Sequence, residues 1–321
     1  MRAIPFRTGY ALNCWLQGTD VELQKEPNNW NIERLCTIVL IKADHNMNNK
    51  LLGRQTMAHG EVHHALAPEQ HGSRKRLSAI QASVNNRLMY DLMRQHRHGS
   101  ILCSNDTKSC YYRIVHLVLS ISLQRLGVPH GPIQSMLRTI QNMHHRIKSA
   151  YGVSNNSYSS GISQPPLQGL IQGHGAAPTG WPGVPLAPPS STQFVKLASV
   201  FISIPPSHDK QQTTIVCTAF VDDTDLWSSS LSPTSTPSET ILRAQNMLDL
   251  WNGLLHSTRG ALVAKKSYWH YIDFEWTGNK WIYSSLPPDL PNLTILNYST
   301  GQREPLTSLS AHQGRRTLGV H

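Results

Sequence analysis

The chain has 321 residues, which is enough for one large domain or two closely associated ones. Hydrophobic residues make up 39% and charged residues 15%, a balance typical of a globular protein that excludes an intrinsically disordered chain. Lys and Arg number 29 against 19 Asp and Glu, giving a net charge of +10. A charge of this sign favours a polyanionic partner such as nucleic acid.

The cysteine and histidine content indicates neither a disulfide scaffold nor a zinc site. The five cysteines are dispersed without a Cys-x-x-Cys pair, which favours reduced thiols in an intracellular protein. The pairs His63-His64 and His144-His145 lack metal-ligand spacing. The N-terminus lacks the apolar core of a secretory signal, and no apolar run reaches the ~20 residues that span a bilayer. We therefore expect an intracellular protein, not secreted and without a membrane partner, in either the nucleus or the cytoplasm.

Apolar patterning predicts several elements in the first half of the chain. Residues 36–41 predict a strand, and residues 101–103 predict a second, short strand that leads to Asp106. Helices are expected over residues 74–97, over 113–126 and from Pro132 onward. The first helix has an apolar stripe of Leu77, Ile80, Val84, Leu88 and Leu92, and the last has one of Ile133, Met136, Leu137, Ile140 and Ile147.

The composition changes between residues 151 and 189 to Gly, Pro, Ser and Asn, as in a linker. Its centre, PLQGLIQGHG over residues 166–175, is too specific a mixture for a spacer, and its glycines allow close backbone approach. After it, Phe194, Leu197, Val200, Phe201 and Ile204 return to helical spacing.

The last part of the chain predicts a strand, a loop, a helix and a group of short strands. The strand covers residues 214–220, and an exposed Ser/Pro/Thr loop is expected over 228–238. The helix opens at Glu239, and short strands and turns follow from residue 267. The helix carries an apolar stripe of Ile241, Ala244, Leu248, Trp251 and Leu255.

Two adjacent carboxylates, Asp222 and Asp223, follow the strand that ends at Phe220. A hemmed-in pair of carboxylates repels itself unless a cation lies beside it. A hairpin tip that holds this pair, with Asp106 from a neighbouring strand end, would form an oxygen-rich site suited to Mg²⁺. The alternative for the dipeptide alone is a polar turn.

Several boxes in this sequence occur in the order found in reverse transcriptases of retrotransposons, which the chain resembles. Residues 105–114 (NDTKSCYYRI) look like motif A, residues 172–178 (QGHGAAP) like motif B, and residues 220–223 (FVDD) like motif C. Residues 260–267 are similar to motif D, and residues 317–320 (TLGV) to the Leu-Gly box near the primer grip. Residues 30–54 and 70–74 also look like fingers segments of that family.

The resemblance implies an α+β fold of right-hand polymerase fingers and palm, with an antiparallel palm sheet, packed helices and a largely missing thumb. Residues 1–100 would form a fingers-like segment and residues 101–270 the palm with motifs A to D. Residues 271–321 would form the end of the palm and a primer-grip-like region. The implied activity is that of an RNA-directed DNA polymerase, which adds dNTPs to a primer 3′-hydroxyl on an RNA template, the primer being DNA or RNA.

By the same resemblance, Asp106 and Asp222 would bind two Mg²⁺ ions, with Mn²⁺ as a possible substitute, and Asp223 would complete the acidic cluster. Such ions would activate the 3′-hydroxyl and stabilise the leaving pyrophosphate. Tyr111 would be the steric gate beneath the incoming sugar, or else an ordinary packed tyrosine. Gln172 and Gly173 would lie against the nascent base pair and template, or else form a flexible loop.

Four basic residues are candidates for contacts with phosphate. Lys266 would protonate or neutralise the departing pyrophosphate, with Lys265 as a close competitor, and either could be a solvated loop lysine. Arg34 or Lys42 would hold the triphosphate, and the sequence leaves that choice open.

Two departures from the family pattern favour an alternative. Tyr112 stands where many members have an acidic residue, and the chain ends directly after the Leu-Gly box. The alternative is a decayed, catalytically inactive retroelement fragment that at most binds nucleic acid. A two-metal nuclease also needs clustered carboxylates, but it explains neither Tyr111 nor the Gln-Gly loop.

Overall fold

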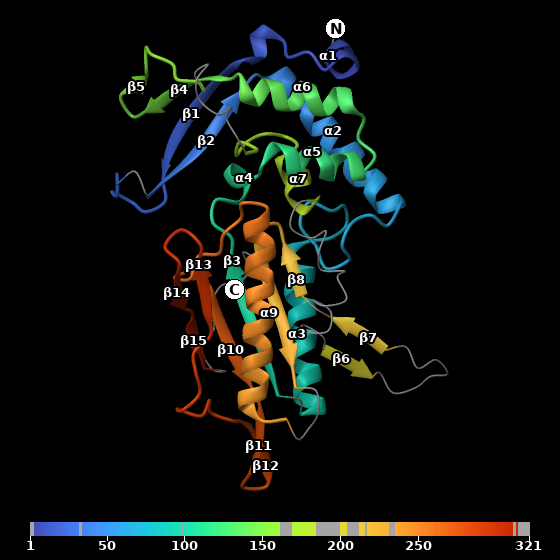
Figure 1. The fold of residues 1–321 in the computed structure, drawn as a ribbon, viewed down its shortest axis with the longest axis vertical. Coiled ribbons are helices and arrows are strands. Elements are labelled where there is room, and N and C mark those ends of the chain that lie inside the picture. The colour runs from blue at the N-terminus through green and yellow to red at the C-terminus, as the bar shows by residue number, and fades with distance from the viewer. Residues whose placement is uncertain are drawn as a thin grey trace. The chain divides into compact units, whose positions relative to one another are not determined.

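The structure is a computed structural model that describes residues 3–31, 34–97, 99–160, 169–183, 200–203, 212–215, 217–230, 235–310 and 313. The chain divides into two compact units, each assembled from two separate stretches (Figure 1). Unit 1 consists of Met1–Leu66 and Ser109–Val184, and unit 2 of Ala67–Lys108 and Pro185–His321. The segments expected from the sequence were consecutive, so their boundaries do not coincide with those of the units.

Unit 1 contains a four-stranded sheet in the order β2-β1-β4-β5. β1 (Gln17–Gln24) pairs antiparallel with β2 (Leu35–Ile41) and parallel with β4 (His144–Ser149), which pairs with β5 (Gly152–Val153). The pairing of β1 with β4 joins the two stretches of the unit. Its helices are α1 (Ala3–Thr8), the 3₁₀ helix η1 (Asn13–Trp15), α2 (Ala43–Val62), α4 (Cys110–Arg113), α5 (His116–Arg125), α6 (His130–Gln141) and α7 (Ala177–Gly183).

The helical expectations for unit 1 are confirmed in part. The single helix expected over residues 113–126 is two helices, α4 and α5, because Ile114 and Val115 adopt extended backbone angles between them. In α6 the expected Ile133, Met136 and Ile140 are buried. Ile147 was wrongly placed on that helix, since it lies in β4, where pairing with β1 sets its conformation.

Unit 2 is built on a five-stranded sheet in the order β15-β10-β3-β9-β8. Antiparallel pairs join β10, β3, β9 and β8, and β15 adds to β10 in parallel. The strands are β3 (Ser100–Asp106), β8 (Cys217–Phe220), β9 (Asp223–Ser229), β10 (Tyr268–Ile272) and β15 (Thr307–Leu309). Among the described residues, three antiparallel hairpins accompany the sheet: β6 (Val200–Ser203) with β7 (Gln212–Ile215), β11 (Phe274–Thr277) with β12 (Lys280–Tyr283), and β13 (Thr294–Asn297) with β14 (Gln302–Pro305).

Two helices cover opposite faces of this sheet, α9 (Pro237–Ser257) and α3 (Ala79–His96) (Figure 1). Because side chains alternate along a strand, Ile101 and Cys103 of β3 pack in the cluster that contains the buried side chains of α9. Leu102 and Trp227 point to the other face and pack against Met89 of α3. The antiparallel core of the sheet and its packed helices agree with the expected α+β class.

The apolar stripe predicted the buried face correctly for α9 and wrongly for α3. The five stripe residues of α9 (Ile241, Ala244, Leu248, Trp251 and Leu255) are all buried. In α3 the helix exists, but Ile80, Val84 and Leu88 are 67%, 50% and 54% exposed. The face that packs on the sheet carries Ala82, Asn86, Met89 and Met93 instead.

The segment around residue 200 corrects another expectation. Val200–Ser203 is a strand paired with β7, not a helix, while Phe194, Leu197 and Ile204 lie outside the described residues. Residues 317–320, the expected Leu-Gly box, also lie outside them. In the described part of the chain, no helix combines the length and apolar character needed to cross a membrane.

Candidate active site

The strand pair β8 and β9 forms a tight hairpin whose tip is Val221 and Asp222. Phe220 pairs with Asp223, which leaves these two residues as the centre of a two-residue turn. Val221 has a φ of 60°, and Asp222 is not among the residues with positive φ. Positive φ at the first central position alone is the pattern of a type II′ turn, which fits the right-handed twist of paired strands. A β-branched residue is strained there, so other contacts must hold this turn.

Asp106 lies directly opposite Asp223 across the β3–β9 pair. The structure therefore brings together, within unit 2, the acidic residues that the sequence placed at two strand ends. Like charges at directly opposed positions are destabilising, because their Cβ atoms lie only about 4.5–5.5 Å apart. The repulsion between two such carboxylates is relieved either by a positive charge nearby or by a proton on one of them.

The electrostatics of the cluster reflect this crowding. Burial raises the pKa of Asp223 to about 7, and the charges of Asp222 and Asp106 add to the effect. The Lys266 ammonium group lies 3.3 and 3.2 Å from the two carboxylate oxygens of Asp106. Lys266 thus supplies a positive charge at the position where a metal cation would also be attracted.

Neighbouring backbone and hydroxyl groups fix Asp106 and the hairpin. The Asp106 amide donates to Ser267 Oγ at 3.2 Å, and its carbonyl accepts from the Val263 amide at 3.0 Å. Thr107 Oγ1 donates to the Asp222 carbonyl at 3.1 Å. The segment expected as motif D therefore contacts the motif A strand, which explains how Lys266 reaches Asp106.

Sequence reasoning gave no role to Asp225, which is fully buried on β9 two residues after Asp223. Alternation along the strand places both side chains on the face that α3 covers. Asn86 of α3 donates to Asp225 Oδ2 at 2.5 Å, and Trp227 Nε1 donates to Asn86 Oδ1 at 3.4 Å. The period-two spacing of Asp223 and Asp225 was the available signal for a second carboxylate beneath the cluster.

The acidic cluster has the donor chemistry of a magnesium site without a finished coordination geometry. Carboxylate oxygens suit a hard divalent cation, and burial together with the charges of Asp222 and Asp106 raises the pKa of Asp223. Among the described residues, no group of three or more His, Cys, Asp or Glu side chains stands ready to hold a metal ion. The Lys266 ammonium group would compete with such a cation for the Asp106 carboxylate.

Gln172 and Gly173 form a loop that is tied to β2 and α2 inside unit 1. The Gln172 carbonyl accepts from the Val39 amide at 3.0 Å, and Gln172 Oε1 accepts from the Cys36 thiol at 3.4 Å. Asn46 Nδ2 donates to the Gly173 carbonyl at 3.1 Å. Gly173 has a φ of 106°, and a Cβ there would lie 2.9 Å from the Val39 carbonyl oxygen. This position therefore requires glycine, because only glycine allows the loop to approach β2 this closely.

Tyr111 and Tyr112 both lie in α4 of unit 1. Tyr111 is half-buried, and its carbonyl accepts from the Leu170 amide at 2.7 Å. The Tyr112 hydroxyl donates to the Thr37 carbonyl at 2.6 Å, and burial raises the pKa of this hydroxyl to about 12. Tyr112 also packs against a small core cluster that contains Val39. The residue that departs from the family pattern therefore has a well-packed structural role.

The two candidate triphosphate ligands differ in their surroundings. Arg34, at the end of the β1–β2 hairpin, forms an ion pair with Glu26 at 3.2 Å. Lys42 precedes the first residue of α2, is exposed, and forms no ion pair with any residue that the structure describes. The Lys42 ammonium group is therefore available to bind a ligand, whereas the Arg34 guanidinium group is already paired with Glu26.

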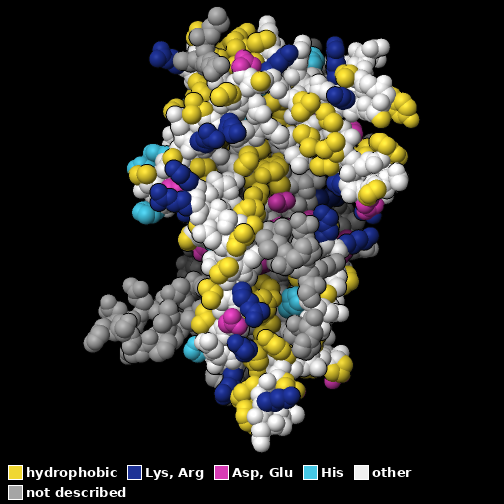
Figure 2. Space-filling model, turned by 180° about the vertical axis from the view of Figure 1, so that it is seen from behind, with side chains coloured by type: hydrophobic (Ala, Val, Ile, Leu, Met, Phe, Trp, Pro, Cys, Tyr) yellow, Lys and Arg dark blue, Asp and Glu magenta, His cyan; other side chains and the backbone are white. Residues whose placement is uncertain are grey.

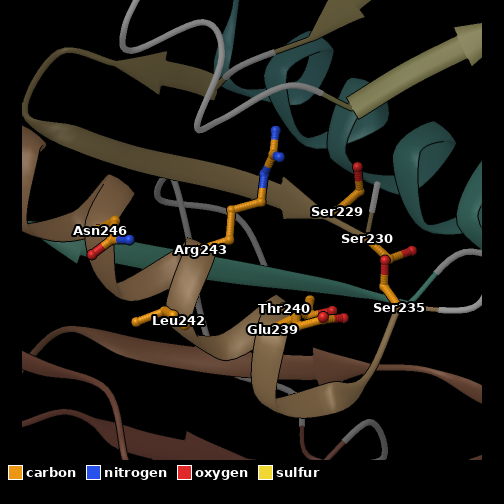
Figure 3. Close-up of a pocket in the computed structure, with 8 residues that line it drawn as sticks. All are labelled: Ser229, Ser230, Ser235, Glu239, Thr240, Leu242, Arg243 and Asn246. Carbon is orange, nitrogen blue, oxygen red and sulfur yellow. The ribbon is translucent and has the colours of Figure 1, made fainter. Parts of the chain in front are cut away.

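A separate cavity of about 380 Å³ in unit 2 contains none of the acidic cluster (Figure 3). It lies between the end of β9 and the first turns of α9, and it is lined by Ser229, Ser230, Ser235, Glu239, Thr240, Leu242, Arg243 and Asn246. Figure 3 shows the Arg243 side chain extending away from Glu239. Partial burial lowers the pKa of Arg243.

No protein-family model matches the sequence, and no curated protein sequence matches it. Comparison with solved structures shows that the fold is similar to that of telomerase. Apo telomerase from Candida tropicalis, truncated from its C-terminal domain, superimposes with a TM-score of 0.51 at 10% identity, over 91% of this chain and 55% of that one. Candida albicans telomerase, complexed with a TWJ fragment of telomeric RNA, gives 0.50 at 12% identity, over 90% of this chain and 45% of that one. The chain thus spans about half the length of these telomerases, and at such identities the likeness concerns the fold.

Proposed function

We propose that this chain is the fingers-and-palm part of a retroelement-type RNA-directed DNA polymerase, with unit 2 as its palm. The observation that carries the proposal is the pairing of Asp106 with Asp223, beside a hairpin tip that holds Asp222. Telomerase is itself an RNA-directed DNA polymerase, so the similarity of fold agrees with this class of enzyme.

The acidic cluster would carry out nucleotidyl transfer. The primer 3′-oxygen forms a bond to the α-phosphorus of a dNTP while the bond to pyrophosphate breaks. Two Mg²⁺ ions bound here would activate that oxygen and stabilise the charge on the leaving group. Asp106 and Asp222 would hold the ions, and Asp223 would complete the negative cluster. Lys266, once released from Asp106, would neutralise or protonate the departing pyrophosphate.

Substrate-binding roles follow from the resemblance to the family. Tyr111 would exclude a 2′-hydroxyl from the incoming sugar, and Gln172 with Gly173 would support the template base pair. Lys42 is the better candidate for the triphosphate because Arg34 is paired with Glu26. Lys and Arg side chains spread over the face in Figure 2 would attract template and primer phosphates. The telomeric RNA bound to the telomerase from Candida albicans is in keeping with an RNA template.

Primer extension on an RNA template tests this proposal. The protein should add dNTPs only when Mg²⁺ or Mn²⁺ is present, and Asp222→Asn should reduce the rate at least about 10³-fold. Asp289→Asn is the matched control, because it makes the same chemical change at an exposed residue of unit 2. Primer extension by the Asp222→Asn variant at the wild-type rate would contradict the proposed site.

A second candidate is a nucleic-acid-binding protein without polymerase activity. It is favoured by the ion pair of Lys266 with Asp106 and by the lack of a ready three-ligand metal group among the described residues. In the same assay it predicts binding of the RNA–primer duplex with no metal-dependent extension by the wild-type protein.

A further inference from the structure

The turn that carries Asp222 is held by a glutamine from a distant part of unit 2. The Val221 amide donates to Gln70 Oε1 at 3.0 Å, and Gln70 Nε2 donates to the Val221 carbonyl at 3.3 Å. Gln70 is 1% exposed, so its side-chain amide has exchanged water for these backbone partners. Both polar groups of the strained residue in the turn are therefore satisfied by one buried side chain.

The segment around Gln70 runs alongside β8. The Ala219 amide donates to the Glu69 carbonyl at 2.9 Å, and the His71 amide donates to the Ala219 carbonyl at 2.7 Å. Gly72 donates to Gln70 Oε1 at 2.7 Å, which orients the side-chain amide toward the turn. A Cβ on Gly72 would lie 2.3 Å from the Val221 nitrogen, so only glycine allows the two segments to approach this closely.

The same segment is anchored on its other side. The Arg74 guanidinium donates to the carbonyls of Ala67 and Gln70 at 3.0 and 3.2 Å. The His71 ring is 3.1 Å from Asn85 Nδ2 on α3. The segment around Gln70, which holds the turn, is therefore itself bound to α3, the helix that covers the sheet.

We propose that Gln70 and Gly72 are positioning residues for the acidic hairpin. They hold the backbone of Val221 in its left-handed conformation, while Thr107 holds the Asp222 carbonyl from β3. Together these contacts set the distance of Asp222 and Asp223 from Asp106. The consequence for catalysis rests on the proposed polymerase function, whereas the effect on the hairpin does not.

Hydrogen–deuterium exchange with mass spectrometry tests the effect on the hairpin. Gln70→Met preserves the volume of the side chain and removes its bonds to Val221, so amides over residues 218–224 should exchange at least about tenfold faster. Exchange in α9 should not change. Gly72→Ala should produce the same local result by displacing the turn. Gln95→Met is the matched control, because it makes the same chemical change at an exposed residue of α3 in unit 2.

Kinetics on the same variants test the positioning role. If the carboxylates are displaced, kcat for primer extension should fall at least about tenfold, while KM for the dNTP stays within about twofold. Unchanged exchange over residues 218–224 in Gln70→Met would overturn the proposal, as would faster exchange with an unaltered kcat. If Gly72→Ala fails to fold, the exchange and kcat of Gln70→Met alone test the positioning role.

The two hypotheses fail in different ways. Wild-type protein that shows no extension, together with faster hairpin exchange in Gln70→Met, would refute the polymerase function and support the contact between Gln70 and the turn. Metal-dependent extension by the wild type, with no change in Gln70→Met, would support the function and refute the positioning role.

Discussion

Asp223 faces Asp106 on the next strand, follows Asp222 in the chain, and precedes the buried Asp225 by two residues. Burial and these charges raise its pKa to about 7 from an ordinary value of 3.8. Between these two pH values the folded chain retains a proton that the unfolded chain has lost. The free energy of unfolding therefore falls as the pH rises through this window.

Asp223→Asn should accordingly stabilise the protein at pH 8 and have little effect near pH 4. We expect a gain of about 1–2 kcal/mol at pH 8, less than the full shift would give because the site is partly open to solvent. Urea denaturation at the two pH values measures it, with Asp289→Asn as the exposed control. An equal effect at both pH values would contradict the crowding of the carboxylates.

Lys266 and a metal cation should compete for Asp106. Lys266→Met removes an ammonium group that is largely exposed, so Mn²⁺ should bind up to about fivefold more tightly. The same change should slow primer extension about 10²-fold if Lys266 serves the leaving pyrophosphate. Titration of Mn²⁺ and single-turnover extension measure the two effects. Lys280→Met, the same change at an exposed lysine of β12, is the control. Weaker Mn²⁺ binding in Lys266→Met would refute the competition.

At the scale of single residues, the sequence could predict which carboxylates lie at strand ends, since Asp106 and Asp222 each follow a recognisable apolar strand. It could not predict the left-handed Val221, because valine disfavours that conformation and only the contacts with Gln70 reveal how it is held. The sequence also could not predict the role of Asn86, because that role depends on which face of α3 meets Asp225.

The two helices on the sheet of unit 2 show when periodicity identifies the buried face. The stripe of α9 is apolar throughout and packs on the sheet as expected. In α3 three residues of the expected stripe, Ile80, Val84 and Leu88, are exposed. The buried face includes Asn86, which bonds to Asp225 and Trp227. The buried face of α3 thus combines apolar side chains with a polar partner for the sheet, and a hydrophobic pattern cannot reveal such a partner.

Substitution of adjacent residues in α3 tests this assignment. Met89 is 1% exposed and Leu88 is 54% exposed. Met89→Ala should therefore cost about 2–5 kcal/mol of unfolding free energy, whereas Leu88→Ala should cost less than about 1 kcal/mol. Chemical denaturation compares the two, and the reverse order would show that the stripe read from the sequence is the buried face.

At the scale of the molecule, each unit joins stretches that are far apart in the chain. The parallel pair of β1 with β4 links residues 17–21 to 144–148 in unit 1, and the β3–β9 pair links residues 100–106 to 223–229 in unit 2. Motif order along the chain predicted the α+β class and the acidic strand ends. It did not predict that each unit is assembled from two separate stretches of the chain, because such pairings depend on partners more than 100 residues away.

The proposed polymerase function depends on one cation site formed jointly by Asp106, Asp222 and Asp223. Electron paramagnetic resonance titration of Mn²⁺ with the wild-type protein and with each Asp→Asn variant examines it without requiring polymerase activity. We predict that each of the three substitutions weakens binding at least about tenfold and that Asp289→Asn leaves it unchanged. Equal Mn²⁺ affinity in the wild type and all three variants would show that these carboxylates do not form a metal site.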